Sequence, residues 1–288
     1  MKYKVDNAII MAAGISSRFV PISYEKPKAL IEVKGEILIE RQIRQLIEAG
    51  VPQIVVVVGY MKEKFEYLKE KFGVVIVENR EYATRNNHST IHAARKYLKN
   101  SYICSADNYF SINPFQAEES DAFYAAVYAP GKTKEWCITA DKDDYIEAVS
   151  IGGQDAWVML GHVFWTEDFS KQFLGILERH YNTKEIINQL WEVIYINNIS
   201  VLQLKVKKYN KSEIFEFDSL EELREFDTIY VNNSNSRILQ KIAKALLVQE
   251  GEIVALVPQK DVLGDVIGFA FSCNQKAYSY NYKTKKWQ

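Results

Sequence analysis

Short apolar runs alternate with amphipathic stretches along the first hundred residues, and this alternation constrains the fold more than any other feature. The β-branched run at residues 54–58 is typical of a strand buried on both faces. Gly50 and Gly73 each stand directly after a predicted helix, at the position where a left-handed residue would end it. Three such repeats, with strands predicted at 8–11, 54–58, 74–77 and 102–105, lead to Asp107. They predict an α/β fold with a mixed, mainly parallel central sheet and flanking helices.

Beyond Asp107 the pattern changes to strands without long intervening helices. Strands are predicted at 122–128, 136–140, 145–150 and 157–165, and the turn sequence DKDD indicates a hairpin. Helices are expected at 167–180 and 184–196, followed by strands at 201–206 and 214–217. Ser219 and Glu222 form a capping-box pattern, which predicts a helix from there to about Thr228.

The polar segment VNNSNS at residues 231–236 has the composition of a linker. After it we expect a helix at 237–249 and two or three strands through Tyr282. The sequence therefore predicts one domain over residues 1–230 and a small α+β appendage over residues 231–288. Because about 55 residues lie near the lower limit for independent folding, we expect the appendage to pack on the main domain or to be part of something larger.

The charge and cysteine content exclude several classes of protein. The 36 basic and 37 acidic residues leave a net charge of −1, so no global field attracts nucleic acid or an anionic membrane. No apolar run approaches the ~20 residues of a membrane-spanning helix. The three cysteines lie far apart and outside any CxxC pair, which argues against disulfides and zinc. We expect a cytoplasmic protein with neither nucleic-acid nor membrane partners.

The segment MAAGISSRFVPISYEKPKAL at residues 11–30 carries the clearest chemical signal. Its small residues Ala12, Ala13 and Gly14 let the backbone approach a ligand closely. Positive charges follow in the same loop at Arg18, Lys26 and Lys28, at the carboxyl end of a predicted strand, where open α/β sheets bind ligands. The loop predicts a triphosphate site. The alternative is a solvated loop with scattered cations, since the GxGxxG and GxxxxGK[ST] patterns are both absent.

This segment resembles the signature of the sugar-nucleotidyltransferase superfamily, [LM]AAGxGxR followed by PKxL. The sequence departs from that pattern at Ser16, where a second glycine is usual. The resemblance implies the Rossmann-like nucleotide-diphosphosugar transferase fold, with residues 1–230 as the nucleotidyltransferase domain. It also implies that the backbone of Ala12, Ala13 and Gly14 holds the base and phosphates, and that Arg18 and Lys28 bind the triphosphate.

Within the superfamily, further segments are similar to bacterial CTP:phosphocholine cytidylyltransferases. They are VVVGYMKEKFEYLKEKFGV, NNHST, NSYICSADNY, KEWCI, GHVFW and IFEFDS, and together they cover roughly residues 7–230. The resemblance implies CTP and phosphocholine as substrates, with further nucleotide contacts near Gly59, Asn87 and Ser89. Which base is selected is not evident from these residues.

Asp107 follows a buried strand, a position where a carboxylate can meet a metal ion. Magnesium is typically held by one or two carboxylates and the substrate phosphates. The resemblance places the second metal-binding aspartate at Asp218. Without the resemblance, the neighbouring Ser219 and Glu222 would indicate that Asp218 is a helix cap. We therefore expect Mg2+ at Asp107 and Asp218.

Aromatic residues provide candidates for a cationic head group, because a quaternary ammonium is bound by aromatic faces and nearby carboxylates. Trp136 and Trp191 match aromatic positions of the phosphocholine enzymes. Glu192 stands where those enzymes have an aspartate, and Glu216 is a further candidate counter-charge. The alternative is that these tryptophans are core residues. His88 and His92 have the spacing of a metal pair but lack a third ligand, so we assign no zinc.

The tail from residue 252 resembles the opening strands of a choline-kinase amino lobe, so a fused or adjacent choline kinase is a possible partner. The predicted reaction is magnesium-dependent transfer of CMP from CTP to phosphocholine, giving CDP-choline and pyrophosphate. Its predicted catalytic residues are Arg18, Lys28, Asp107 and Asp218. Three alternatives stay open: another amino-alcohol phosphate or aminoethylphosphonate as acceptor, a sugar-1-phosphate acceptor, and a non-catalytic nucleotide-binding module of a fused kinase.

Overall fold

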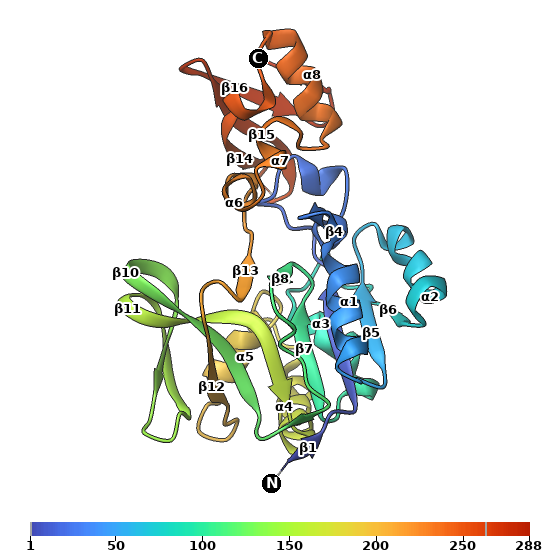
Figure 1. The fold of residues 1–288 in the computed structure, drawn as a ribbon, viewed down its shortest axis with the longest axis vertical. Helices are drawn as coiled ribbons and strands as arrows, with labels where there is room; N and C mark the ends of the chain where they lie inside the picture. Colours follow the sequence, from blue (N-terminus) through green and yellow to red (C-terminus); the bar gives the residue numbers. More distant parts are fainter. Residues whose placement is uncertain (1, 263) are drawn as a thin grey trace. The chain divides into compact units, whose positions relative to one another are not determined.

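The computed structural model describes residues 2–262 and 264–288, which divide into two compact units (Figure 1). The first unit comprises the chain up to Gly14 together with Leu38–Glu216. The second combines Ile15–Ile37 with Phe217–Gln288. The segment that carries Arg18 and Lys28 therefore belongs to the same unit as the C-terminal part of the chain. The domain boundary expected at residue 230 stays a prediction.

The first unit is built on one seven-stranded sheet, in the order β12-β10-β11-β7-β2-β5-β6. These strands are β2 (Asn7–Ala12), β5 (Ile54–Val58), β6 (Val75–Glu78), β7 (Ser101–Ser105), β10 (Phe123–Ala140), β11 (Ile146–Trp165) and β12 (Lys205–Tyr209). Strand β2 is parallel to β5 and β7, β5 to β6, and β10 to β12. Only β11 runs antiparallel to its neighbours. The predicted mixed, mainly parallel sheet is confirmed.

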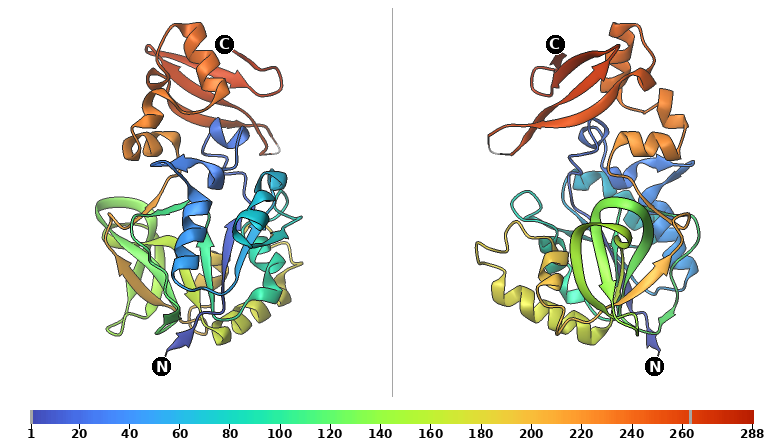
Figure 2. Two further views of the ribbon diagram at one scale, coloured as in Figure 1. Left: turned by 45° about the vertical axis from the view of Figure 1, so that its right-hand side comes forward. Right: turned by 90° about the vertical axis from the view of Figure 1, so that its left-hand side faces the viewer.

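Helices cover both faces of this sheet. They are α1 (Leu38–Glu48), η3 (Lys62–Phe65), α2 (Tyr67–Phe72), α3 (His88–Ala93), η4 (Arg95–Tyr97), α4 (Glu167–His180) and α5 (Trp191–Ile196). Helices α3, α4 and α5 share one hydrophobic cluster with Ile9, Val57 and Ile103 of the central strands. Figure 2 shows α4 and α1 on opposite sides of the sheet. Within the described residues, no helix combines the length and apolar character of a membrane span.

Two short strand pairs complete the first unit. Strand β1 (Tyr3–Lys4) pairs with β9 (Glu118–Glu119), and β8 (Asn108–Phe110) pairs antiparallel with β13 (Ile214–Glu216). The second pair matters for function, because it brings the chain near residue 216 to the turn that follows β7. Glu216 lies directly opposite Asn108 in this pairing.

The second unit contains several short helices and two small sheets. Strands β3 (Glu32–Val33) and β4 (Glu36–Ile37) form a hairpin, and β14 (Val254–Lys260), β15 (Val266–Cys273), β16 (Lys276–Asn281) and β17 (Lys286–Trp287) form an antiparallel sheet. The helices are η1 (Ile22–Tyr24), η2 (Lys28–Leu30), α6 (Leu220–Phe226), α7 (Ile229–Asn232), α8 (Arg237–Leu246) and η5 (Glu250–Glu252). A helix followed by strands was expected here.

Hydrogen bonds to backbone groups tie the segments of the second unit together. The buried Arg224 donates to the carbonyls of Ile253 and Glu250, at 2.8 and 2.9 Å. Asp227 accepts a 2.7 Å bond from the backbone N–H of Lys34. A buried guanidinium that loses such partners is costly, so these contacts fix residues 217–230 against both the early segment and the C-terminal sheet.

The expected helix ends are confirmed where a local sequence signal exists. Ser219 is the N-cap of α6 and accepts a 3.2 Å hydrogen bond from the backbone N–H of Glu222. Gly50 and Gly73 have positive φ angles of 76° and 69°, as left-handed residues at helix ends. Helix α4 has the predicted bounds.

Two expectations were wrong. The helix predicted at 184–196 forms only from Trp191 onward, because backbone carbonyls before it accept bonds from another segment. Asn86 donates to the carbonyls of Ile187 and Asn188, each at 3.0 Å. Four strands were predicted between residues 122 and 165. The structure has two long strands there, β10 and β11, which are joined at the expected hairpin turn.

Gly161 in β11 packs so closely against Ser105 that a side chain there should be costly. A Cβ at this position would clash with Oγ of Ser105 and lie 2.6 Å from its Cβ, so Ser105 or the backbone would have to move. We expect Gly161→Ala to lower the free energy of unfolding by about 1–3 kcal/mol. Gly175→Ala is the matched control, because Gly175 is exposed in α4 with open space around it, and it should add about 0.4–1 kcal/mol. Urea denaturation measures both; equal stability of the two variants would contradict the packing argument.

Candidate active site

The carboxyl ends of β2 and β5 bring together the first group of predicted nucleotide-binding residues. Ala12 ends β2, Gly59 follows β5, and the two strands are parallel neighbours. The backbone N–H of Tyr60 donates to the carbonyl of Ala13 at 3.1 Å, which joins the two loops. Gly14 is exposed, with open space where a side chain would stand. The backbone after β2 is therefore accessible to a ligand.

Gly59 also has a packing role. A Cβ there would lie 2.7 Å from the ring of Tyr82. Because that contact is far inside van der Waals distance, glycine is needed at this position whether or not a nucleotide binds. Its predicted contact with the nucleotide stays a prediction.

Two predicted site residues of the second unit pair with each other. Nη1 of Arg18 lies 2.7 Å from Oδ2 of Asp218, and the side chains are 72% and 35% exposed. Asp218 is not the cap of α6, since Ser219 fills that position. An exposed ion pair of this kind contributes only ~0–1 kcal/mol to stability. The pair therefore leaves both side chains able to exchange partners.

Lys28, by contrast, is almost fully buried. It is 5% exposed at the start of η2, and its Nζ lies 5.5 Å from the centroid of the Phe19 ring. A buried ammonium is held in place by its surroundings and cannot swing as a surface lysine does. A phosphate can therefore bind Lys28 only by coming to the fixed position of its Nζ atom.

Asp107 lies in the turn between β7 and β8 and is partly exposed. The next residue, Asn108, is 1% exposed, and neither atom of its side-chain amide has a hydrogen-bond partner in the part of the chain that the structure describes. Carboxylate and amide oxygens are the hard donors that magnesium prefers. No three His, Cys, Asp or Glu side chains gather into a metal cluster within residues 2–262 and 264–288. Magnesium needs only one or two carboxylates beside the phosphates, so the partly exposed carboxylate of Asp107 fits it.

Asn87 connects the residues that were assigned to the head group. Its Oδ1 accepts a 2.7 Å bond from the backbone N–H of Trp191, and its Nδ2 donates to Oε2 of Glu192 at 3.0 Å. The structure places Asn87 beside Glu192, and its predicted contact with the nucleotide stays a prediction. Its side chain fixes the start of α5 against the start of α3.

Trp191 is a core residue in this structure. It is 1% exposed, its ring is stacked on that of Tyr124 at 5.7 Å, and Trp165 meets it edge-on at 5.2 Å. Trp136 lies on β10 opposite Ile151 and makes no ring contact among the described residues. The two tryptophans of the predicted cage are therefore in different environments, and their shared role stays a prediction.

Two carboxyl groups, those of Glu192 and Glu216, lie close to Tyr124. Burial raises the pKa of Glu192 to about 7, although hydrogen bonds from Asn87 and Tyr124 favour its ionised form. Burial also raises the pKa of Tyr124 well above its usual value, as do the charges of Glu192 and Glu216. Among the described residues Glu192 forms no ion pair. Tyr124 was not among the predicted site residues, because its only sequence signal is its place in an apolar strand.

The remaining candidates have structural partners. Ser89 is buried; its hydroxyl accepts from Nδ2 of Asn79 at 2.9 Å and donates to the carbonyl of Asn86 at 2.8 Å. Nδ1 of His88 lies 2.8 Å from the carbonyl of Gln189, and the ring of His92 stacks on Tyr181 at 3.8 Å. Each of these three side chains therefore has a partner within the protein, and no ligand is needed to explain its position.

The parallel sheet, with the small-residue loop after its first long strand, has the arrangement expected of a nucleotidyltransferase. Residues 8–138 match the model of the MobA-like NTP transferase domain. The chain is similar to the solved structure of the CTP:phosphocholine cytidylyltransferase from Streptococcus pneumoniae, with a TM-score of 0.75 over 79% of this chain and 99% of that one. An inositol-1-phosphate CTP transferase from T. maritima, 19% identical, shares the fold with a TM-score of 0.60.

Sequence comparison specifies the family. The chain is 33% identical over 227 residues to the choline-phosphate cytidylyltransferase of Streptococcus pneumoniae, covering 79% of this chain and 99% of that protein. It is 37% identical over 229 residues to the 2-aminoethylphosphonate cytidylyltransferase of Lancefieldella rimae, covering 78% and 93%. The chain therefore belongs to the family of cytidylyltransferases that contains these enzymes. The predicted fold and enzyme class are confirmed.

Neutralising Glu192 should stabilise the protein above neutral pH. The raised pKa means that the folded state keeps the proton at a pH where the unfolded chain has lost it. Wild-type stability therefore falls as pH rises from about 4.5, the unfolded value, to about 7. Because Gln cannot titrate, Glu192→Gln should match the wild type at low pH and exceed it by about 1–3 kcal/mol above pH 7, with allowance for partial exposure.

Urea unfolding at several pH values measures this difference. Glu178→Gln, an exposed carboxylate on α4, serves as the matched control and should not reproduce it. A Glu192→Gln variant that is less stable than the wild type at pH 8 would show that the ionised carboxylate is well accommodated.

Proposed function

We propose that this enzyme transfers CMP from CTP to phosphocholine in a magnesium-dependent reaction, giving CDP-choline and pyrophosphate. The observation that carries the choice of head group is the presence of two carboxyl groups, those of Glu192 and Glu216, close to Tyr124. Glu192 and Glu216 both raise its pKa, in a part of the first unit lined by aromatic rings. A cationic head group would offset this charge, and a neutral sugar would not.

The reaction needs little covalent chemistry from the protein. A phosphate monoester has a second pKa of ~6, so near neutral pH phosphocholine is already an anionic nucleophile and needs no general base. Its oxygen attacks the α-phosphorus of CTP, and the bond from that phosphorus to the oxygen bridging to the β-phosphate breaks. Pyrophosphate leaves with the electron pair. The protein must position the two phosphates and offset their repulsion.

The signature loop supplies this positioning in the proposal. The backbone of Ala12, Ala13 and Gly14 would hold the base and phosphates, supported by the accessible chain at Gly14. Arg18 and Lys28 would bind the triphosphate and the departing pyrophosphate. Arg18 is exposed and can move to a ligand, whereas Lys28 is buried and already fixed.

Asp107 is the proposed magnesium ligand of the first unit, supported by its position after β7 and by the partial exposure of its side chain. Asp218 is proposed as the second carboxylate on the family resemblance alone. In the second unit it pairs with Arg18, so binding a metal would require it to give up this partner. When bound, magnesium supplies positive charge that neutralises the phosphates.

A primary ammonium head group is the second candidate. Carboxylates accept hydrogen bonds, which 2-aminoethylphosphonate and phosphoethanolamine can donate and a quaternary ammonium cannot. The position of Glu192 beside Tyr124 favours such a group as much as it favours choline. A choline cage would need the aromatic faces of Trp136 or Trp191, and Trp191 is already covered by protein.

The decisive experiment is pyrophosphate release from four nucleoside triphosphates, each combined with phosphocholine, phosphoethanolamine, 2-aminoethylphosphonate or glucose-1-phosphate, with and without magnesium. The proposal expects turnover with CTP and phosphocholine only when magnesium is present. Preference for a primary ammonium would select the second candidate. Turnover with glucose-1-phosphate instead would overturn the head-group assignment and leave the family assignment intact.

Glu192→Gln tests the head-group residues in the same assay. Removing its charge should raise KM for the cationic substrate at least tenfold and leave KM for CTP unchanged. Trp136→Ala, compared with Trp157→Ala on the same hairpin, separates an aromatic contact from general damage to β10 and β11. Trp191→Ala is less informative, because deleting a buried tryptophan costs ~3–5 kcal/mol of stability by itself.

Asp107→Asn should lower kcat by ~10²–10³-fold, as expected when a charge-stabilising group is lost, without unfolding the protein. Magnesium titrations of turnover measure the effect. Asp143→Asn is the control, since Asp143 is an exposed carboxylate in the β10–β11 turn. Wild-type magnesium dependence in Asp107→Asn would remove Asp107 from the metal site.

The proposal also includes location and partners. Use of CTP and three free, buried cysteines support a reducing cytoplasm. A fused or adjacent choline kinase would supply phosphocholine directly. The helix and antiparallel sheet of residues 237–287 are compatible with an amino-lobe fragment, and this part of the proposal rests on the sequence resemblance.

A further inference from the structure

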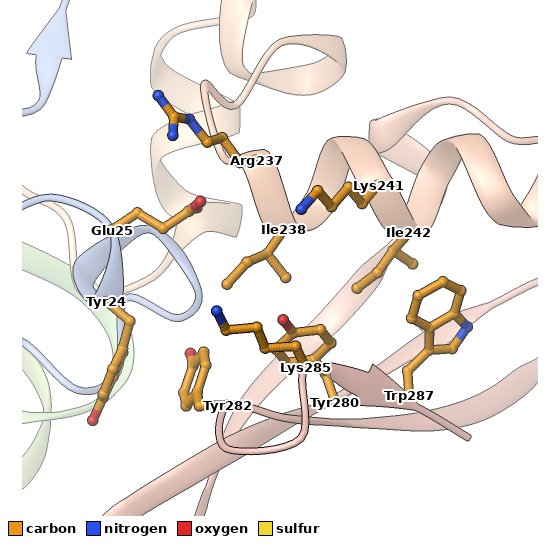
Figure 3. A pocket seen from close by; sticks show the side chains of 10 residues that line it. All are labelled: Tyr24, Glu25, Arg237, Ile238, Lys241, Ile242, Tyr280, Tyr282, Lys285 and Trp287. Atoms are coloured by element: carbon orange, nitrogen blue, oxygen red, sulfur yellow. The ribbon is translucent and has the colours of Figure 1, made fainter.

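The second unit contains a cavity of about 400 Å³ that none of the residues assigned above enters (Figure 3). This volume lies within the ~300–1,000 Å³ typical of small-molecule sites. Its walls come from η1, α8, β16, β17 and the turn between these two strands. The lining residues are Tyr24, Glu25, Arg237, Ile238, Lys241, Ile242, Tyr280, Tyr282, Lys285 and Trp287.

Four aromatic side chains form one part of the lining. The rings of Tyr24 and Tyr282 are stacked with their centroids 4.4 Å apart and 18° between their planes. Tyr280 meets Tyr282 edge-on at 5.8 Å, and Trp287 is half-buried at the other side of the cavity. In Figure 3 Ile238 and Ile242 lie between these rings and helix α8. Such a wall suits a planar aromatic ligand, because ring-on-ring packing is favourable beyond simple burial.

Three cations form the other part of the lining. Arg237 and Lys241 are four residues apart on α8 and so share one face of that helix. Figure 3 shows Lys241 and Lys285 extending from opposite walls toward Ile238. Glu25 is the one acidic residue among those that line the cavity. In the part of the chain that the structure describes, none of the three cations forms an ion pair.

Together these walls define the chemistry of the ligand. Uncompensated cations favour an anion, and arginine and lysine are the usual binders of phosphate. Stacked aromatic rings beside cations are also how proteins hold nucleobases without sequence readout. A bare inorganic anion would use the cations but leave the aromatic wall and most of the volume empty.

We propose that this cavity binds a nucleoside 5′-phosphate, with the base against the aromatic wall and the phosphate held by Lys241, Lys285 and Arg237. The site is separate from the residues proposed for CTP, magnesium and the head group. About a fifth of this chain lies outside the alignment with the Streptococcus pneumoniae relative. The proposed site does not depend on which head group the enzyme accepts.

Trp287 supplies a local probe of occupancy. The full chain, labelled with 5-fluorotryptophan, has five fluorinated sites, and Trp287→Phe identifies the resonance of Trp287. Titration with AMP, CMP, GMP and UMP should shift that resonance in a saturable way for at least one of them. The variant Lys241→Gln/Lys285→Gln should weaken this binding at least tenfold.

Matched controls separate this site from others. Lys244→Gln changes an exposed lysine of α8 outside the cavity lining and should bind like the wild type. Inorganic phosphate and adenosine, titrated separately, should each bind at least tenfold more weakly than the preferred nucleotide. Far-ultraviolet circular dichroism checks that each variant is folded.

Three results would overturn the proposal. The first is a Trp287 resonance that no nucleotide shifts in the wild type. The second is unchanged nucleotide affinity in the folded double variant. The third is inorganic phosphate or adenosine binding as tightly as the nucleotide, because either the aromatic wall or the cations would then contribute nothing to the affinity. Each result concerns binding at Trp287, so none depends on the outcome of the cytidylyltransferase assays.

Discussion

The parallel pairing of β2 with β5 and β7 is the constraint on which the candidate active site depends. Because all three strands run in the same direction, their carboxyl ends meet at one edge of the sheet. Ala12, Gly59 and Asp107 each stand at or just beyond the end of one of these strands. Residues far apart in the sequence thus become neighbours through backbone hydrogen bonds, which do not require any particular side chain at the site.

A second set of contacts organises the region proposed for the head group. Asn87 bonds both the backbone at Trp191 and the carboxylate of Glu192, so the starts of α3 and α5 are fixed to each other. The cost of burying the Glu192 charge appears as its raised pKa. A protein can carry such a cost where a cationic ligand relieves it, which is why this carboxylate is central to the proposed function.

The second unit combines two kinds of anion chemistry. Its early segment carries Arg18 and Lys28, proposed for the CTP triphosphate, and Tyr24 of the same segment lines the aromatic and basic cavity. Arg18 forms an exposed ion pair with Asp218, whereas among the residues that the structure describes the cations of the cavity have no carboxylate partner. Uncompensated cations beside stacked rings are what distinguish the cavity from an ordinary solvated surface.

The sequence by itself determined the elements whose signals are local. The alternation of apolar runs and helical periods predicted the sheet, Ser219 predicted the start of α6, and the small-residue loop predicted the superfamily. Tertiary structure decided what depends on partners distant in the chain. Residues 184–190 have a helical pattern but form turns, because the carbonyls of Ile187 and Asn188 accept bonds from Asn86.

The same distinction holds for the site. Asp107 and the signature loop could be singled out from residue type and spacing, whereas Tyr124 could not, since its environment is made by α5 and β13. The pairing of Arg18 with Asp218 and the cavity between η1 and α8 also join distant segments. Periodicity and motifs report on local backbone geometry, and only the folded chain decides which polar and aromatic side chains meet.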